Sequence, residues 1–420
     1  MIYVHSLWKH VGPGLLLLVA ILGLIVAGAQ MTQAQTETVL YRFAGSPDGS
    51  EPFFAKPVFD KSGNLYGTTA GGGAYWCGSV TCGTVFMLTP SGAETILHNF
   101  GASVTDGYGP RSGLVIDTEG NLYGTTEEGG AHTCGAVTCG TVYKLTPSGA
   151  ETILYSFGAS GDGFSPGGPL IVDSKGNFYG TTFFGGSCSN INGCGTVFKV
   201  TPGGKETVLW SFGNGKDGAN PNGGLVFDAN GNLFGTTSYG GAYGQGTVFE
   251  LTSSGDETVL FSFGNEKKGG TAPNGGLVVD ANGNLYGTTW IGGAYRCGTV
   301  FELTPSGQET ILHSFVGHRH GDRDGCAPEA GLAVDANGNL YGTTDGGGAY
   351  GRGTVFELMP PAWEETILWS FEPRKKNDGL IPEGGLVFDG NGNLYGTTTV
   401  GGGSGCAPEP GCGTVYKVTP

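Results

Sequence analysis

Short apolar runs separated by polar turns recur along the chain, and residues 276–315 contain one complete unit of this pattern. Its four runs span residues 276–280, 284–289, 298–304 and 309–315. The fourth run alternates polar and apolar residues with a period of two, which is typical of a β-strand. Tight turns, Ala281-Asn282-Gly283 and Pro305-Ser306-Gly307, join the first two runs and the last two. We therefore predict four antiparallel strands, A to D, whose longer B–C and D–A loops lie on one face, called the top.

The unit occurs seven times, as copies of the stretch Gly63-Asn64-Leu65-Tyr66-Gly67-Thr68-Thr69 show. Six further copies, with small changes, begin at Gly120, Gly176, Gly231, Gly283, Gly338 and Gly392. The step of about 55 residues is near the length of a kelch repeat and indicates a propeller or an array. We predict an all-β fold, a seven-bladed β-propeller of four-stranded antiparallel blades.

The last blade requires a strand from the other end of the chain. Only six copies are followed by a D strand, because the sequence stops after the seventh C strand at 413–419. Residues 37–43 (ETVLYRF) match the D strand at 94–100 (ETILHNF) almost position by position. Strand 37–43 is therefore predicted to complete blade 7, residues 385–420, and to close the ring without an open seam. The propeller domain is predicted to span 37–420.

Residues 1–29 have the pattern of a secretory signal peptide. Lys9 precedes an apolar segment at 15–27, and Ala27-Gly28-Ala29 offers a cleavage site. The segment is shorter than the ~20 residues of a membrane-spanning helix. We expect cleavage after Ala29 and no membrane insertion of the mature chain, with a retained anchor as the alternative. The mature protein is expected to be a monomer, secreted or at the cell surface, in the periplasm or outside the cell.

Ten cysteines in an exported chain predict disulfide bonds. Four local pairs would each close a B–C loop: Cys77/Cys82, Cys134/Cys139, Cys188/Cys194 and Cys406/Cys412. Cys297 lies in a B–C loop without a local mate, and Cys326 lies in the following D–A loop on the same face, so we pair these two. Such a bond closes about 30 residues and would contribute about 3.5 kcal/mol. Zinc is disfavoured, because no C-x-x-C spacing occurs.

Composition limits the class of partner. Glycine accounts for 84 of 420 residues without a collagen period, which indicates many tight turns. The formal charge is −16, so nucleic acid is not expected as a partner. A glycan or an extracellular protein fits this mildly acidic, exported chain better.

The repeat resembles a known family. The pattern G-L-x-x-D-x-x-G-N-L-Y-G-T-T-x-x-G-G…G-T-V-F-x-L, carried by seven copies over residues 37–420, resembles the GloVer tandem repeat of exported bacterial proteins with varied anchoring signals, and is more distantly similar to NHL-type propeller blades. The resemblance implies an exported repeat propeller and no particular reaction or ligand. The sequence differs from members with a C-terminal sorting tail, which leaves release from the cell as the simpler expectation.

Positions that are constant in the seven copies are interpreted as architectural. The aspartate before each Gly-Asn turn is expected to bond turn backbone amides, with calcium as a weaker alternative because the later glutamate ligand is absent. The Thr-Thr pairs are expected to bond across blades rather than to act as nucleophiles. Six D–A loops carry an aspartate four residues before a proline: Asp48, Asp106, Asp162, Asp217, Asp324 and Asp378. These are read as Asp-Gly turns, with a cation- or sugar-binding rim around the channel as the alternative.

Positions that vary between copies are the candidates for ligand binding. The two residues after each Thr-Thr begin the B–C loops, and an aromatic residue follows a little later in most copies. Aromatic rings beside carboxylates suit a sugar or peptide, whereas packing between blades is the alternative. The candidates are Glu127, Glu128, Phe184, Tyr239, Tyr243, Trp290, Tyr295, Asp345 and Tyr350.

One D–A loop is unlike the others, because His318, His320, Asp322 and Asp324 alternate along it. In an extended segment these four side chains share one side and would suit a metal ion. A solvated polar loop fixed by Cys326 is the ordinary explanation, and no cofactor is otherwise expected. His98 and His313 occupy a strand-D position that is aromatic in the other blades, so both are interpreted as packing residues.

The leading hypothesis is a secreted, non-enzymatic binding scaffold that recognises a glycan or protein through the top-face B–C and D–A loops. No catalytic residue is assigned. The alternative is an extracellular polysaccharide hydrolase or lyase with carboxylates at the channel mouth, for example Glu127 or Glu128 with Asp162.

Overall fold

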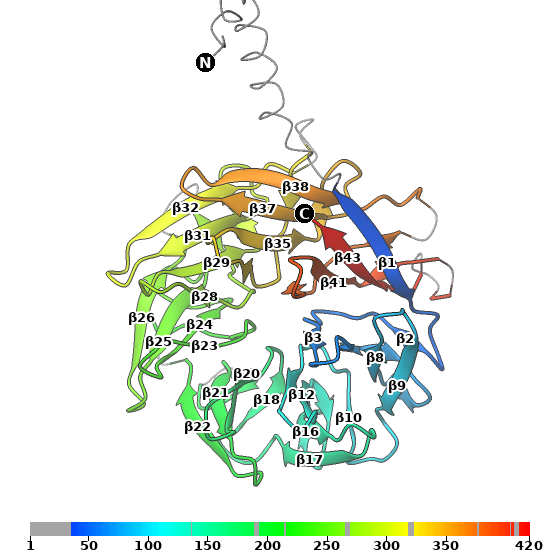
Figure 1. The fold of residues 1–420 in the computed structure, drawn as a ribbon. Coiled ribbons are helices and arrows are strands. Elements are labelled where there is room, and N and C mark those ends of the chain that lie inside the picture. The colour runs from blue at the N-terminus through cyan, green and yellow to red at the C-terminus, as the bar shows by residue number, and fades with distance from the viewer. Residues whose placement is uncertain are drawn as a thin grey trace, which may run out of the picture.

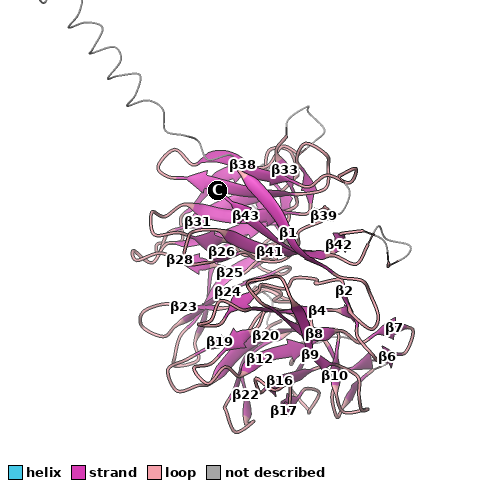
Figure 2. Ribbon diagram, turned by 45° about the vertical axis from the view of Figure 1, so that its right-hand side comes forward, coloured by secondary structure: helices cyan, strands magenta, loops and turns pink. Residues whose placement is uncertain are grey.

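The computed structural model describes residues 35–420 except 136, 189–192, 214–215, 265–268, 318–322, 376–377, 404 and 407–410. In these residues seven antiparallel sheets stand in a ring (Figure 1). The described part of the chain consists of strands and loops and contains no helix (Figure 2). The predicted seven-bladed β-propeller is confirmed. The predicted signal peptide, residues 1–29, lies outside the described residues.

Each blade has four main strands, A to D from the channel outwards. The A strands are β3 (Val58–Phe59), β11 (Val115–Ile116), β19 (Ile171–Val172), β23 (Val226–Phe227), β28 (Val278–Val279), β34 (Ala333–Val334) and β40 (Val387–Phe388). The B strands are β4 (Leu65–Thr69), β12 (Leu122–Thr126), β20 (Phe178–Gly185), β24 (Leu233–Thr237), β29 (Leu285–Thr289), β35 (Leu340–Thr344) and β41 (Leu394–Thr398). The C strands are β8 (Thr84–Leu88), β16 (Thr141–Leu145), β21 (Thr196–Val200), β25 (Thr247–Leu251), β31 (Thr299–Leu303), β37 (Thr354–Met359) and β43 (Thr414–Thr419). The D strands are β9 (Glu94–Asn99), β17 (Glu151–Ser156), β22 (Glu206–Ser211), β26 (Glu257–Ser262), β32 (Glu309–Ser314), β38 (Glu364–Ser370) and β1 (Thr36–Arg42).

The first strand closes the ring, as predicted. β1 pairs antiparallel with β43, with Thr36 opposite Thr419 and Arg42 opposite Thr414. The two strands lie side by side although they come from opposite ends of the chain (Figure 1). Blade 7 therefore has the strand order β40-β41-β43-β1.

Short two-stranded ribbons join the D–A loop to the B–C loop in most blades, which confirms that both loops lie on the top face. The ribbons are β2 (Gly49–Ser50) with β5 (Gly71–Gly72), β10 (Gly107–Tyr108) with β13 (Glu128–Gly129), β27 (Gly270–Thr271) with β30 (Ile291–Gly292), β33 (Gly325–Cys326) with β36 (Gly346–Gly347), and β39 (Gly379–Leu380) with β42 (Val400–Gly401). In blade 3 the long strand β20 makes the same connection by pairing with β18 (Gly163–Pro166) within the blade sheet. Two B–C loops contain a further hairpin, β6 (Trp76–Cys77) with β7 (Val80–Thr81) and β14 (Thr133–Cys134) with β15 (Val137–Thr138).

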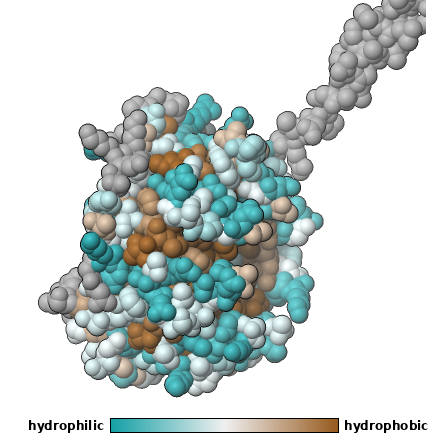
Figure 3. Space-filling view, turned by 90° about the vertical axis from the view of Figure 1, so that its left-hand side faces the viewer, coloured by the Kyte–Doolittle hydropathy of each residue, from teal (hydrophilic) through white to brown (hydrophobic). Residues whose placement is uncertain are grey.

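The hydrophobic core lies between neighbouring blades. In one cluster Val85 and Phe100 of blade 1 pack against Leu114, Leu122 and Tyr143 of blade 2, and corresponding clusters join the other neighbouring blades. On the outside of the ring near β26, hydrophobic residues form patches bordered by hydrophilic ones (Figure 3). Since each blade buries its faces only against its neighbours, the stability of every blade depends on a complete ring.

The glycine and threonines of strand B are explained by packing and hydrogen bonds. A Cβ at Gly67 would lie 2.6 Å from the ring of Phe86, which leaves room only for glycine. The Thr68 hydroxyl donates to the Ser112 carbonyl of the next blade (3.0 Å), and the Thr69 hydroxyl lies 2.7 Å from that of Thr84. The Thr-Thr pairs thus bond across blades and across strands, as expected.

The aspartate before each Gly-Asn turn also has the predicted structural role. Asp60 Oδ1 accepts hydrogen bonds from the backbone N–H groups of Ser62 and Asn64, and its Oδ2 accepts from the Asn64 amide and the Tyr66 hydroxyl. The aspartate–asparagine side-chain bond recurs in all seven blades. Both carboxylate oxygens are therefore used within the turn.

All five predicted disulfides are present. They are Cys77–Cys82, Cys134–Cys139, Cys188–Cys194, Cys297–Cys326 and Cys406–Cys412. Five such bonds indicate an oxidising compartment, in the periplasm or outside the cell. Within the described residues, no helix has the length and apolar character needed to span a bilayer.

Replacing Cys297 and Cys326 together by serine is expected to cost about 3.5 kcal/mol, because this bond closes the longest loop of the five. The melting temperature should fall by about 4 °C in a chain of this size. The matched control replaces Cys77 and Cys82, which are only 5 residues apart, and should cost about 2 kcal/mol. Circular dichroism melts compare the two variants, and a larger loss for the short-loop pair would contradict the loop-closure explanation.

Candidate functional site

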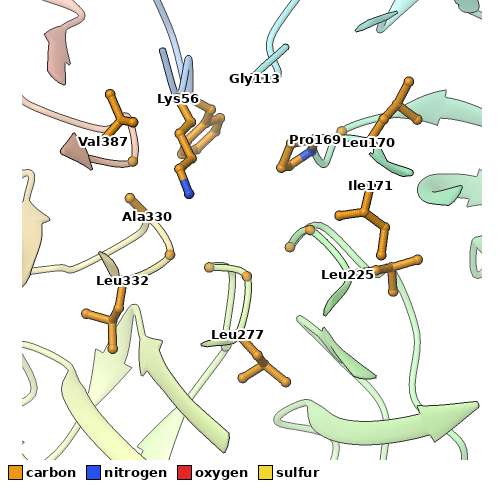
Figure 4. A pocket seen from close by; sticks show the side chains of 18 of the residues that line it. Lys56, Gly113, Pro169, Leu170, Ile171, Leu225, Leu277, Ala330, Leu332 and Val387 are labelled. Carbon is orange, nitrogen blue, oxygen red and sulfur yellow. The ribbon is translucent and has the colours of Figure 1, made fainter. Parts of the chain in front are cut away.

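A central cavity of about 450 Å³ runs along the A strands, and residues from all seven blades line it (Figure 4). Most of its wall is apolar, with Val58, Ile171, Leu225 and Leu332 among the lining side chains. Polar groups are concentrated at the top end, where Asn222, Asn274, Glu329 and Glu383 belong to the lining. The channel opening on the top face is therefore the candidate ligand-binding site.

Two variable positions of the repeat meet at this opening. The first, directly after the D–A proline, is Phe53, Arg111, Gly167, Asn222, Asn274, Glu329 and Glu383 in blades 1 to 7. The second, directly after Thr-Thr, is Ala70, Glu127, Phe183, Ser238, Trp290, Asp345 and Thr399. Arg111 Nη1 lies 3.0 Å from Glu127 Oε2, and Ser238 donates to Asn274 Oδ1 at 2.7 Å. The Thr399 hydroxyl donates to Glu383. Residues of the two sets thus alternate around the mouth.

Three carboxyl groups come together on one side of the mouth. Glu329, Asp345 and Glu383, here called the carboxylate cluster, each bring one oxygen to within 4.8 Å of the others. Burial and then repulsion by Glu329 and Glu383 raise the pKa of Asp345 to about 9. Burial, followed by repulsion from Glu383, raises the pKa of Glu329 to about 7, and burial also raises that of Glu383.

The carboxylate cluster has two chemical uses. At neutral pH it retains protons, so it offers both hydrogen-bond donors and acceptors. The Asp345 Oδ1 atom is buried and has no hydrogen-bond partner within the described residues. Three carboxylate oxygens at this spacing also have the chemistry of a hard divalent cation site.

The mouth is asymmetric as a result. From blade 4 to blade 7 the alternating positions form what we call the mouth arc: Ser238, Asn274, Trp290, Glu329, Asp345, Glu383 and Thr399. Hydrogen bonds and close carboxylates connect its members at both ends of the arc. Trp290, which occupies the same repeat position as Ser238 and Asp345, is 37% exposed. On the opposite side the Arg111–Glu127 ion pair leaves both groups engaged.

The structure separates the predicted binding residues into two groups. Asp345 and Trp290 belong to the mouth arc, while Tyr239, Tyr243, Tyr295 and Tyr350 are exposed on the B–C loops of blades 4 to 6. The remaining three have partners within the top-face loops. Glu127 pairs with Arg111, Glu128 accepts the Tyr108 hydroxyl at 2.6 Å, and Phe184 stacks on Phe164.

The D–A loop aspartates do not form a rim around the channel, so that alternative is wrong. Asp162 accepts the Tyr155 hydroxyl at 2.9 Å and the amides of Gly158 and Gly163, and it faces Glu206 of the next D strand. The reason is that strand D is the outer strand, and its aromatic residue and glutamate hold the aspartate between blades. Engaged in this way, Asp162 is not available as the channel carboxylate of the suggested catalytic pair.

Six aspartate–glutamate pairs of this kind occur, here called the inter-blade dyads. They are Asp48/Glu94, Asp106/Glu151, Asp162/Glu206, Asp217/Glu257, Asp324/Glu365 and Asp378/Glu37. Asp324, a candidate metal ligand from the sequence, is instead bonded to His313 (3.2 Å) and to the Val316 amide. The other three candidates, His318, His320 and Asp322, lie outside the described residues. His98 and His313 contact Phe100 and Phe315, as expected for packing residues, but both also lie beside dyad carboxylates, with His98 Nε2 3.8 Å from Asp106 and from Glu151 and His313 Nε2 3.7 Å from Glu365.

Sequence reasoning missed the residues after the D–A proline, which include Asn274, Glu329 and Glu383. The signal was present, because this position varies within a constant surrounding just as the position after Thr-Thr does. The residue after the D–A proline and the residue after Thr-Thr are adjacent only because the D–A and B–C loops pair on the top face. Sequence spacing alone does not indicate this pairing.

Comparison with known proteins agrees with the repeat. The model of the Gloeobacter/Verrucomicrobia repeat matches residues 26–190, 134–323 and 316–420. The chain belongs to this repeat family. No curated protein matches it. Among solved structures, the extracellular domain of a protein described as a one-component system of B. thetaiotaomicron is similar at a TM-score of 0.56 and 10% identity, over 90% of this chain and 39% of that one.

This member of the Gloeobacter/Verrucomicrobia repeat family thus spans well under half of that protein, and the likeness concerns the fold alone. A gluconolactonase of Xanthomonas campestris is similar at a TM-score of 0.43 and 13% identity, over 91% of this chain and 89% of the other. A protein described as a 6-phosphogluconolactonase of Bacteroides uniformis reaches 0.49 and 14%, over 85% and 99%.

Proposed function

We propose that this propeller binds an extracellular glycan at the mouth arc. The observation that carries the proposal is the order of groups in the arc: an amide, an exposed indole, three carboxyl groups and a hydroxyl. Amide and carboxyl groups pair with neighbouring sugar hydroxyls, and an exposed ring covers the apolar face of a pyranose. The raised pKa values of the carboxylate cluster support this use, because hydroxyl groups need donors as well as acceptors.

The surroundings of the arc favour a chain of several sugars over a single one. Tyr239, Tyr243 and Tyr295 are each half exposed on the B–C loops of blades 4 and 5, outside the mouth. These rings belong to the same B–C loops as Ser238 and Trp290. An oligosaccharide with one end at the mouth could therefore rest its following units on these rings.

Binding is tested first on an array of cell-wall polymers and of bacterial and plant polysaccharides, and then by calorimetry with the best ligand. Trp290→Ala and Asp345→Ala should each weaken binding about tenfold or more, which corresponds to a loss of about 1.4 kcal/mol. Tyr75→Ala is the matched control, because Tyr75 is an exposed aromatic at the position of Tyr295 but in blade 1, away from the arc.

Three results would count against glycan binding at the arc. The first is an array without any binding, and the second is a loss for Tyr75→Ala equal to that for Trp290→Ala. The third is capture of a protein, but no saccharide, by the same surface. Release of new reducing ends from a bound polysaccharide would instead favour hydrolysis at the carboxylate cluster.

A further inference from the structure

Lys56 occupies a position where the other blades have no charged side chain. The residues equivalent to it around the channel, here called the inner ring, are Gly113, Pro169, Gly224, Gly276, Gly331 and Gly385. All seven line the central cavity. Neighbours in the inner ring are close, since a Cβ at Gly113 would lie 2.9 Å from the Lys56 carbonyl oxygen and one at Gly385 would lie 3.4 Å from Lys56 Cβ. The wall at this level is therefore backbone, with a single cationic side chain.

The amine of Lys56 reaches into the cavity. Figure 4 shows the side chain extending from its wall toward the middle of the opening, with the nitrogen at the tip. Among the described residues, no hydrogen bond or ion pair reaches this amine. Lys56 is exposed to the solvent in the channel, and the walls of the central cavity surround it. This enclosure lowers the pKa of Lys56, and no carboxylate offsets the effect.

The inner ring lies below the mouth arc, because the chain passes Glu329 and Glu383 before it reaches Gly331 and Gly385 on its way from the top-face loops into strand A. A sugar whose hydroxyl groups bond to the arc would thus direct a substituent at its far end toward Lys56.

We propose that the glycan is acidic and that Lys56 binds the carboxylate of a terminal uronic acid at the inner ring. This inference rests on the proposed function, which it narrows to one class of saccharide. A carboxylate is the counter-ion that an enclosed amine lacks, and charge-assisted hydrogen bonds of this kind are stronger than neutral ones. The carboxylate cluster carries less than three negative charges near neutral pH, because Asp345 and part of Glu329 hold protons, so it opposes the entry of an anion less than three ionised groups would.

The test uses the full chain and matched pairs of trisaccharides that differ only in charge: galacturonate and galactose, glucuronate and glucose, mannuronate and mannose. Calorimetry near neutral pH should show at least about tenfold tighter binding of the acidic member of one pair. Lys56→Met should reduce that preference to less than about twofold, while Lys56→Arg should retain most of it. Lys56→Gly, which restores the residue of most blades, is a second neutral variant that fits the backbone.

The outcomes separate this inference from the proposed function. Equal binding of acidic and neutral trisaccharides, or an acid preference that survives in Lys56→Met and Lys56→Gly, would overturn the role of Lys56 and leave glycan binding in place. Absence of binding by every saccharide would overturn both. Circular dichroism of each variant shows that the ring is folded before its binding is compared.

Discussion

Removal of residues 35–43 is expected to abolish the folded ring. β1 supplies strand D of blade 7, and Leu40, Tyr41 and Phe43 pack in the cluster that joins blades 7 and 1. Phe43 is only 3% exposed. Burying three side chains of this size stabilises a protein by about 6 kcal/mol. The whole stability of a typical domain is about 5–15 kcal/mol. The truncated chain should lose its cooperative melt and its near-ultraviolet circular dichroism.

The control for this deletion keeps a D strand in blade 7 but takes its sequence from another blade. Replacing residues 37–43 by the D strand of blade 2, 151–157 (ETILYSF), preserves the alternation and the terminal phenylalanine. This chimera should melt as the natural protein does. A truncated protein with a natural melting curve would show that the ring does not need its closing strand.

Stability is expected to fall as the pH rises from about 4.5 to about 9. Burial and then repulsion by the dyad aspartate raise the pKa of Glu94, Glu206 and Glu257 to about 7. The same causes raise that of Glu151 to about 8 and that of Glu365 to about 9. A carboxyl group whose pKa is raised by folding stabilises the fold fully below its unfolded pKa, near 4.3, and loses this contribution as the pH passes its folded pKa.

At low pH the dependence is reversed, and stability is expected to fall as the pH decreases. Burial alone would raise the pKa of Asp60, but hydrogen bonds from Asn64, Tyr66 and Ser62 hold it below its usual value, and Asp117, Asp173 and Asp389 behave alike. These groups stabilise the fold above pH 4 and lose that contribution as the pH falls. Maximum stability is therefore expected near pH 4.

Thermal melts from pH 4 to pH 9 measure this dependence. If each inter-blade dyad contributes about 1 kcal/mol, the loss by pH 9 is on the order of 5 kcal/mol, or about 6 °C. Glu206→Gln should make the melting temperature fall less steeply as the pH rises, because it removes the titrating group of one inter-blade dyad. Glu309→Gln is the control, because Gly269 replaces the aspartate of the preceding loop. Equal flattening by both substitutions, or a stability that rises toward pH 9, would show that the dyads do not govern the alkaline limb.

The fold could be predicted almost completely, because the repeat aligns the sequence with itself. Thr68 and Asp60 recur in every copy, which identified them as structural before their bonds were seen. The positions of Cys297 and Cys326 placed two loops on one face. Each of these inferences depends on contacts within a blade or between adjacent loops, and such contacts follow from strand order.

The site was predicted only in part, because it depends on how blades are placed around the axis. Asp162 was expected to have the channel as an alternative location, but its partners Tyr155 and Glu206 belong to outer strands of two blades. Glu329 and Lys56 were missed because they lie in glycine-rich stretches at the start of strand A. Nothing in those stretches indicates that seven of them converge on one cavity.

The pairing of the first strand with the last has a consequence for biosynthesis. β1 is made first, yet its partner is more than 370 positions away, from Arg42 to Thr414. Until the final strand leaves the ribosome, the nascent chain has an unmatched edge and an uncovered apolar face at each end of the growing row of blades. Contacts this distant are slow to form, and exposed edges favour association between chains. Pairing of β1 with β43 is therefore the last step of folding. We expect the need for chaperones to be greatest just before this step.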